Sequence, residues 1–277
     1  MHEILAHLRV GSLVLDLGCA KGSFPQNAAA ADVVRVDREP QGNLGALTRF
    51  VQADAAQLPF ADDTFAAVIL NHSLEHFDNL GAALHERGRV IAPNGSLFVA
   101  VPDASSLSDK LHRWLARGGR VNAFTCAADT AAAIAHATGL PHLATRVLCS
   151  SLSFLNRRTA PRPLPRRLLA LGAGYEWSLF LFTWLSRRRW LNTRTSVYGW
   201  GFYFGNVVEP IDTDTWVNVC IRCGSGYSAA HLARLGLVRS RFLRFRTWRC
   251  PECHAFNPFA DDFSVGHCAR PDSSTSA

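Results

Sequence analysis

The chain has 277 residues, a formal net charge of +7 and a hydrophobic content of 48%. That content is ample for a buried core, and the length suits one domain of about 200 residues with a small appendage. Residues 1–10 hold an acid and two histidines between short apolar runs, so we expect no cleavable signal peptide. Residues 1–150 carry 12 Lys and Arg against 14 Asp and Glu, whereas residues 151–277 carry 17 Arg against 8 acids, so the second part is the basic one.

The apolar runs along the chain predict strands that alternate with helices. We expect strands at residues 12–17, 33–37, 50–53, 66–71, 96–101, 143–154 and 197–208. We expect helices at about residues 22–31, 43–48, 78–90 and 127–138. The run Pro93-Asn94-Gly95 predicts a turn between a helix and the next strand. This order is typical of an α/β fold.

Acidic residues stand at the ends of the first three predicted strands: Asp16, Asp37 and Asp54. Gly18 and Gly22 follow the first of them, and glycine lets a backbone turn sharply and come close to a ligand. Asp37 lies 21 residues after Asp16, near the spacing at which nucleotide-binding folds place a carboxylate on ribose hydroxyls. Three carboxylates suit a nucleoside with a cationic tail and suit a pyrophosphate poorly. The glycine spacing also differs from the dinucleotide Gly-x-Gly-x-x-Gly pattern.

On these residues the chain resembles the class I S-adenosylmethionine (SAM)-dependent methyltransferases, in particular the subgroup typified by quinone-biosynthesis methyltransferases. The resemblance covers residues 12–102 and extends loosely to about residue 208. Ala20 stands where the family's first motif usually has its middle glycine. The blocks that match most clearly are residues 16–22, 57–65, 68–77 and 88–102.

The resemblance implies a Rossmann-like sheet of seven strands, with an antiparallel last strand and SAM at the carboxyl ends of the first half. Gly18 and Gly22 would line the methionine part of SAM, and Asp16 would support that loop. Asp37 would hold the ribose hydroxyls, and Asp54 with the next backbone amide would meet the adenine. The residues implied to bind the cofactor are Asp16, Gly18, Ala20, Gly22, Asp37, Asp54, Ala55 and Asn71.

Asn71 and His72, at the end of the fourth predicted strand, would face the methyl donor. His72 and His76 are the candidate catalytic residues, because an imidazole titrates near neutral pH and can remove a proton from an acceptor hydroxyl. The alternative is that His72, Glu75 and His76 only orient the helix that follows. Both interpretations stay open at this point.

Two Cys-x-x-Cys pairs predict a metal site near the C-terminus. The first is Cys220-Ile-Arg-Cys223 and the second is Cys250-Pro-Glu-Cys253, with 26 residues between them. Four thiolates suit a tetrahedral Zn²⁺, and a zinc with no open position is structural. Possible alternative ligands are His254, His267 and Cys268. The remaining cysteines are scattered as in a reduced intracellular protein, so a disulfide framework is not expected.

The insertion at residues 155–195 is the best indication of substrate class. Residues 168–185 form an apolar-rich run with arginines on both flanks. The run is borderline in length for a bilayer span, which needs about 20 residues, and a span would split the sheet domain. A lid or a membrane-surface helix is the more plausible interpretation, and an ordinary helix packed on the sheet is the alternative.

The segment 239–249 interleaves five arginines with aromatic residues beside the predicted zinc site. Such a pattern could hold RNA through phosphate contacts and base stacking. The alternative, which we favour, is a strand of a zinc ribbon with arginines on one face and Phe245 on the other.

We therefore expect an α/β protein with three parts: a methyltransferase domain (1–208) with an inserted helical cap (155–195), a zinc-ribbon-like segment (209–260) and a flexible tail (261–277). Its expected reaction moves a methyl group from SAM to a hydroxyl or other nucleophile of a small, glycan or lipid-linked acceptor. The alternatives are an RNA methyltransferase and a non-catalytic SAM-fold interaction protein. The expected location is the cytoplasm, with possible association with a membrane surface.

Overall fold

The computed structural model describes residues 2–5, 8–20, 22–24, 31–40, 49–116, 121–159, 164–165, 167, 169, 172–188, 193–207, 211, 215–241 and 245–261. Most of the predicted helix at 22–31, all of the one at 43–48, and the predicted tail beyond residue 261 lie outside the described residues.

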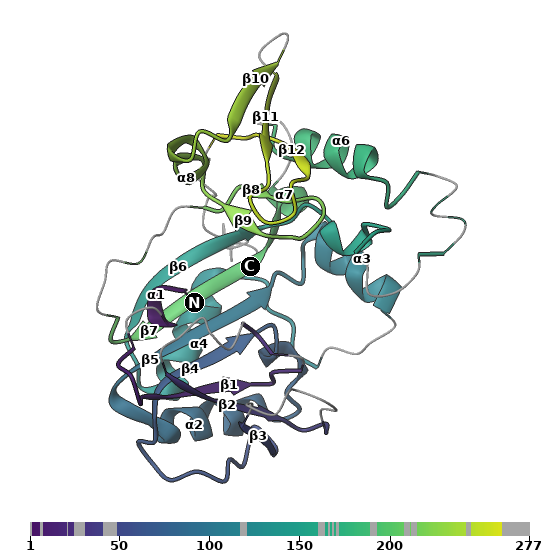
Figure 1. The fold of residues 1–277 in the computed structure, drawn as a ribbon. Coiled ribbons are helices and arrows are strands. Elements are labelled where there is room, and N and C mark those ends of the chain that lie inside the picture. Colours follow the sequence, from purple (N-terminus) through teal and green to yellow (C-terminus); the bar gives the residue numbers. More distant parts are fainter. Residues whose placement is uncertain are drawn as a thin grey trace, which may run out of the picture.

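A seven-stranded sheet forms the larger part of the molecule (Figure 1), in the order β3–β2–β1–β4–β5–β7–β6. Strands β1 to β5 pair in parallel, and β7 runs antiparallel to both β5 and β6. This is the arrangement that the sequence resemblance implies. The strands are β1 (Leu13–Leu17), β2 (Asp32–Asp37), β3 (Arg49–Gln52), β4 (Phe65–Asn71), β5 (Ile91–Pro102), β6 (His142–Cys149) and β7 (Val197–Gly205).

Two apolar layers cover the two faces of the sheet. Its central parallel strands are therefore buried on both faces, and their sequences are continuous apolar runs. On one face, strand residues such as Leu15 and Val68 pack in a cluster with residues of α2 (Leu80–Val90) and α4 (Ala127–Thr138). On the other face, Val14 and Ile69 pack with Ile4 and Leu5 of α1 (His2–Leu5). Alternate residues of each strand thus serve opposite layers.

Helices α2 and α4 begin and end close to the sequence expectations. Asn79 caps α2 by accepting a hydrogen bond from the amide of Ala82, and Gly139 ends α4 in the left-handed conformation. The predicted turn at residues 93–95 lies inside β5, where the register against β4 jumps from Ile91 to Ser96. The sequence did not predict α3 (Leu107–Ala116) or the short helix η2 (Leu74–His76).

The cysteine-rich segment and the inserted residues lie beyond the β6 edge of the sheet, with α3 and α6 on the same side of the molecule (Figure 1). The inserted residues contain η3 (Ser153–Leu155), α6 (Glu176–Ser186) and α7 (Thr193–Ser196). The cysteine-rich segment contains β8 (Asn218–Val219), β9 (Gly226–Tyr227), α8 (Ala229–Arg234), β10 (Val238–Arg241), β11 (Phe245–Arg249) and β12 (Phe256–Pro258). Within the described ranges, no helix combines the length and apolar character needed to cross a bilayer.

Candidate active site and metal centre

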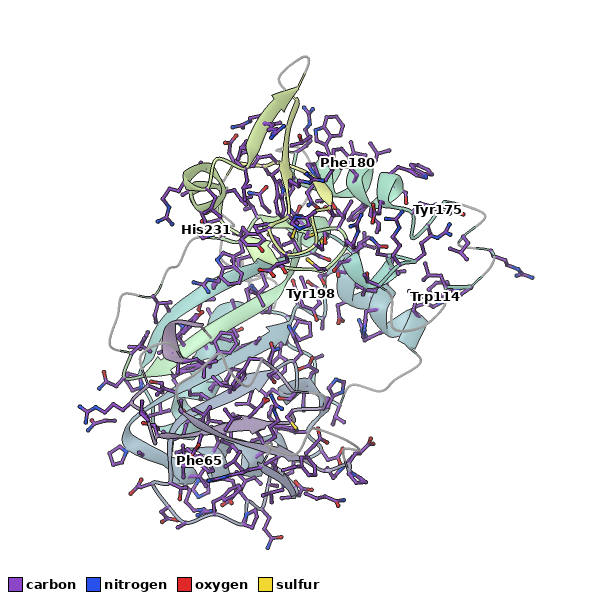
Figure 2. All side chains as sticks on the ribbon, in the orientation of Figure 1. Phe65, Trp114, Tyr175, Phe180, Tyr198 and His231 are labelled. Atoms are coloured by element: carbon purple, nitrogen blue, oxygen red, sulfur yellow. The ribbon has the colours of Figure 1, made fainter. Side chains whose placement is uncertain are left out.

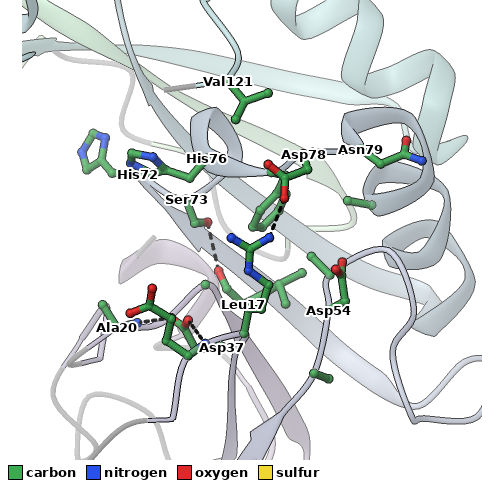
Figure 3. A pocket seen from close by; sticks show the side chains of 17 residues that line it. Leu17, Ala20, Asp37, Asp54, His72, Ser73, His76, Asp78, Asn79 and Val121 are labelled. Atoms are coloured by element: carbon green, nitrogen blue, oxygen red, sulfur yellow. Dashed lines mark hydrogen bonds and ion pairs between the residues drawn. The ribbon is translucent and has the colours of Figure 1, made fainter. Parts of the chain in front are cut away.

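A cleft of about 540 Å³ opens at the carboxyl ends of β1, β2 and β4 (Figure 3). Its volume falls within the range of about 300–1,000 Å³ that is usual for small-molecule and cofactor sites. Parallel strands place their carboxyl ends at one edge of the sheet, and ligands bind there. The lining residues are Leu17, Gly18, Ala20, Asp37, Arg38, Glu39, Ala53, Asp54, Ala55, His72, Ser73, His76, Phe77, Asp78, Asn79, Ala83 and Val121.

The loop after β1 is tightly folded against the start of η2. Gly18 has a φ of +67°, and a Cβ added there would lie 2.4 Å from the Cβ of Ser73. The Ser73 hydroxyl donates a hydrogen bond to the carbonyl of Leu17 at 2.9 Å, which holds the two segments together. Ala20 has a φ of 43°, so this alanine keeps the left-handed conformation that glycine adopts more easily. The loop therefore exposes backbone to the cleft with little side chain in the way.

The carboxylate of Asp37 joins the loop after β1 to the loop after β2. One oxygen accepts a hydrogen bond from the amide of Ala20 at 2.8 Å, and the other accepts one from the amide of Glu39 at 3.0 Å. Each carboxylate oxygen can accept a second hydrogen bond, so both remain able to meet a pair of hydroxyls. Asp54, at the end of β3, turns its own backbone by accepting a hydrogen bond from the amide of Ala56 at 2.8 Å.

Asp16 lies behind the loop and does not line the cleft. Its fully buried carboxylate accepts a hydrogen bond from the amide of Ser23 at 2.9 Å and lies 3.5 Å from Nε of Arg35. Burial raises the pKa of this carboxyl above its ordinary value, although the Ser23 and Arg35 contacts oppose the shift. A Cβ on Gly22 would meet the Arg35 guanidinium at 2.8 Å, so this glycine makes room for the ion pair.

Two imidazoles stand at the end of the cleft near Ala20, away from Asp54 (Figure 3). His72 follows β4 directly, has a φ of 56° and donates its backbone amide to the carbonyl of Ala100. A left-handed histidine is uncommon and is typical of residues held in place at functional sites. The His72 ring lies 5.1 Å from the ring of Tyr198, the second residue of β7.

The structure adds residues that sequence reasoning missed. Arg38 reaches across the cleft to Asp78, at 2.5 Å, and joins the loop after β2 to the loop after η2. Val121, between α3 and α4, lines the cleft, and its amide donates to the carbonyl of Glu75. The neighbouring Asn122 donates its side-chain amide to the carbonyl of Phe77 at 2.8 Å. No sequence signal places residues 121–122 over η2, because the contact spans more than 40 residues.

The cleft brings together most of the residues predicted from sequence. Those on its lining are Gly18, Ala20, Asp37, Asp54, Ala55, His72 and His76. Asp16 and Gly22 lie behind it, and Asn71 ends β4 without lining the cleft. The binding and catalytic roles of these residues stay predictions.

The four predicted cysteines meet in one cluster, with all four Sγ atoms within 4.8 Å of one another. The Sγ atoms of Cys220 and Cys253 are 3.4 Å apart, and those of Cys223 and Cys250 are 3.6 Å apart. A tetrahedral zinc with bonds of about 2.3 Å requires sulfur separations of about 3.8 Å, so the cluster fits zinc closely. Among the described residues the cluster contains no histidine, and the alternatives His267 and Cys268 lie outside them.

Amide donors to Cys220 suit a thiolate at this position. The amide of Arg222 lies 3.4 Å from its Sγ, and the side-chain amide of Asn257 lies 3.6 Å from it. Such N–H groups stabilise the negative charge of a metal-bound sulfur.

The first cysteine pair is tied to the inserted residues by hydrogen bonds to three consecutive carbonyls. Ser151 donates to Cys220 at 2.9 Å, Asn156 donates to Ile221 at 2.9 Å, and Thr159 donates to Arg222 at 2.8 Å. The buried side chain of Ile221 packs in one apolar cluster with Leu155 and with Leu179 of α6. The metal centre is therefore continuous with the cap and is not a separate appendage.

The strand order, the glycine turn after β1 and the acids at the ends of β1, β2 and β3 define a class I SAM-dependent methyltransferase fold. In comparison with known proteins, the family described as a methyltransferase domain matches residues 1–145. This is more than half of the chain, so the chain belongs to that family.

Curated relatives cover the same region. The chain is 35% identical over 108 residues to the ubiquinone/menaquinone biosynthesis C-methyltransferase UbiE of Pasteurella multocida, which is 33% of this chain and 40% of the relative. It is 30% identical over 128 residues to the ubiquinone biosynthesis O-methyltransferase of Azorhizobium caulinodans, and 29% identical over 124 residues to the 27-O-demethylrifamycin SV methyltransferase of Amycolatopsis mediterranei. These two matches cover 39% and 38% of this chain. The chain spans half or less of the length of these relatives.

Solved structures with similar folds include the 1,6-didemethyltoxoflavin-N1-methyltransferase of Burkholderia thailandensis, at 17% identity and a TM-score of 0.44. A geranyl diphosphate methyltransferase matches at 15% identity and a TM-score of 0.48. The matches cover 74% of this chain, and 75% and 82% of those chains respectively. The assignment does not rest on these structures, because both TM-scores lie below 0.5.

Proposed function

We propose that this protein transfers a methyl group from SAM to a hydroxyl or other nucleophile of a small, lipid-linked or glycan acceptor. One observation supports this most: a single cleft joins Gly18, Asp37 and Asp54 to the two imidazoles of His72 and His76. The first three residues suit the methionine, ribose and adenine parts of SAM in that order. The histidines stand where an acceptor would meet the methyl group.

SAM supplies a methyl group already activated by its sulfonium, so the protein mainly needs to align the acceptor and exclude water. Asp37 fixes the ribose, and the Gly18 loop gives backbone contacts without steric hindrance. His76 is the proposed base that accepts a proton from an acceptor hydroxyl, and His72 orients the acceptor against Tyr198.

The proposed acceptor site lies at the part of the sheet formed by β5, β7 and β6, and at the cap. β5 leads directly through Asp103 into α3, and α3 packs with α6 through Leu111 and Leu115 in one apolar cluster. In this division, residues 1–208 form the methyltransferase domain, 155–195 the cap and 209–260 the zinc segment. A lipid-linked acceptor would be presented at a membrane surface.

Zinc at the four cysteines is proposed to be structural. All four thiols would be used as ligands, which leaves no open position for catalysis. Segments as small as this one rarely hold a stable core without a metal or another support.

The RNA alternative receives less support from the arginines of β11. Arg246 binds Asp261 and lies over the ring of Phe259 at 4.8 Å, and Arg249 lies over the ring of Phe256 at 5.4 Å. Trp248 is buried and donates to the carbonyl of Pro258. These side chains are engaged within the zinc segment, as in the ribbon-strand interpretation.

The test is transfer of a labelled methyl group from SAM to separate pools of lipid extract, nucleotide sugars, small metabolites and RNA. We expect label in the lipid or small-molecule pools, and much less label with Asp37→Ala. Label in RNA would favour the alternative substrate. A protein that binds no SAM would contradict the proposed function itself.

A further inference from the structure

Helix α6 leaves an apolar face on the surface of the molecule. Its inner residue Leu179 is buried, whereas Trp177 and Leu181 are 64% and 47% exposed. A surface helix of a soluble domain normally turns charged or polar side chains outward. Every residue of α6 after its first, Glu176, is uncharged. The outward face of α6 therefore lacks the usual polar surface.

Helix α3 exposes apolar side chains as well. Trp114 is 63% exposed and Leu107 is 40% exposed, although both belong to a helix whose inner residues pack against the α6 cluster. Figure 2 shows Trp114, Tyr175 and Phe180 along the side of the molecule that α3 and α6 form. We call the exposed side chains Leu107, Trp114, Trp177 and Leu181 the aromatic face.

Positive charge surrounds the aromatic face. Arg157 lies over the ring of Tyr175 at 4.7 Å, and Arg188 lies over the ring of Trp184 at 4.1 Å. Lys110 is exposed on α3, and the side chain of Arg158 is 65% exposed beside the start of α6. Arginines held on aromatic rings next to exposed tryptophans are typical of proteins that lie at a membrane interface.

The negative charges of both helices are neutralised. Asp109 is the acid within α3, and it is buried and bound to Arg113 at 2.8 Å. Glu176 is the acid within α6, and it binds Arg222 of the metal centre at 2.6 Å and Arg158 at 3.7 Å. Because both acids are paired, Lys110 of α3 and the arginines next to α6, Arg157 and Arg188, leave an excess of positive charge near the aromatic face.

We propose that the aromatic face docks on an anionic lipid bilayer. Tryptophan and leucine side chains would enter the headgroup boundary, and Lys110 and Arg188 would bind lipid phosphates. This inference rests on the proposed function, since it explains how a lipid-linked acceptor reaches a cleft that lies at the same edge of the sheet as the start of α3.

The test is flotation of the full-length protein with vesicles of phosphatidylcholine alone or mixed with phosphatidylglycerol. We expect binding to the anionic vesicles at low salt, and weaker binding at high salt, because screening shortens the reach of the charges. Trp177→Ala with Leu181→Ala should weaken binding by at least about tenfold. Lys110→Gln and Arg188→Gln should each weaken it by about fivefold.

Matched controls at the end of α8 are Leu235→Ala and Arg234→Gln, which change an exposed leucine and an exposed arginine outside α3 and α6. Both should float like the parent protein. Three results would each overturn the proposal. These are no binding to anionic vesicles at low salt, equal binding to neutral vesicles, and full binding by the Trp177/Leu181 double variant. A soluble dimer that the double variant converts to a monomer would also overturn it. SAM affinity, measured separately by calorimetry, reports on the proposed function alone.

Discussion

Arg222, between the two cysteines of the first pair, binds Glu176, the first residue of α6, through two parallel hydrogen bonds. Nε lies 2.6 Å from one carboxylate oxygen and Nη2 lies 3.0 Å from the other. The Nη1 atom of the same arginine donates to the carbonyl of Cys253 in the second pair at 3.0 Å. One side chain thus connects both halves of the metal centre to the cap, across 46 residues of sequence.

This ion pair should couple the stability of the cap to that of the metal centre. In a double-mutant cycle with Arg222→Met and Glu176→Gln, we expect a coupling free energy of about 1 kcal/mol, because both side chains are partly exposed. Arg222 lowers the pKa of the Glu176 carboxyl. A depressed carboxyl pKa stabilises the fold above its unfolded value near 4.3, so this contribution should fade as the pH falls below that value. A cycle with no coupling at neutral pH would contradict the role.

Zinc should be bound at about one equivalent per chain by Cys220, Cys223, Cys250 and Cys253. Cys250→Ser should release the metal and should change the fluorescence of the tryptophans on α6, since the first cysteine pair holds that helix. The control is Cys126→Ser, because this half-buried cysteine lies outside the cluster. Metal analysis that finds no zinc in the parent protein would refute the assignment.

Asp37 should carry much of the affinity for SAM. Its loss removes charge-assisted hydrogen bonds to the ribose, which costs about 2–3 kcal/mol or on the order of a hundredfold in affinity. Calorimetry on Asp37→Ala measures this loss. Asp32→Ala is a matched control, because Asp32 begins the same strand at the end far from the cleft and is more than half exposed. Equal affinity for the two variants would show that Asp37 does not bind the ribose.

The histidines should affect transfer more than binding. We expect His76→Ala to lower the rate of methyl transfer by about a hundredfold or more with a hydroxyl acceptor, and to leave SAM affinity nearly unchanged. His85→Ala provides the comparison, since His85 is exposed on α2 away from the cleft lining. Parallel losses in SAM affinity and rate would assign His76 a structural role in η2 instead.

Arg87 should destabilise the fold. Its side chain is fully buried in α2, faces the ring of Phe77 at 6.0 Å, and has no hydrogen-bond partner for its three nitrogens among the described residues. Burial lowers the pKa of Arg87 to about 9, so it is charged at neutral pH. Replacing a buried unpaired charge with Met should raise the free energy of unfolding by about 1–2 kcal/mol.

The sign of the pH dependence provides a second check on Arg87. The unfolded chain holds this proton more tightly than the folded one, because the pKa of an arginine in water lies well above that of the buried side chain. Above pH 9 the folded protein can release the proton and avoid part of the cost, so the advantage of Arg87→Met should shrink as the pH rises. Urea unfolding of both proteins at pH 7.5 and 10, taken as a difference, measures this trend. A constant or growing advantage would contradict a buried charge.

Much of the fold could be predicted from the sequence, because its signals are local. The apolar run of β1, the acid at the end of β2 and the end of α4 at Gly139 are each decided by neighbours within a few residues. The cysteine spacing also predicted that the four cysteines meet in one cluster, since each pair forms a short turn of its own that aims two sulfurs at one point. These features need no knowledge of distant contacts.

The sequence did not predict α3 or the arrangement of the helices in the cap, because packing against distant segments decides both. The left-handed backbone of His72 is held by the hydrogen bond from its amide to the carbonyl of Ala100, and Arg222 binds the first residue of α6. Whether an apolar helix is buried, spans a bilayer or lies on a surface cannot be decided from its composition, because each outcome uses the same side chains. Tertiary contacts decided it here: Leu179 packs inward against Ile221, and Trp177 and Leu181 are left on the surface.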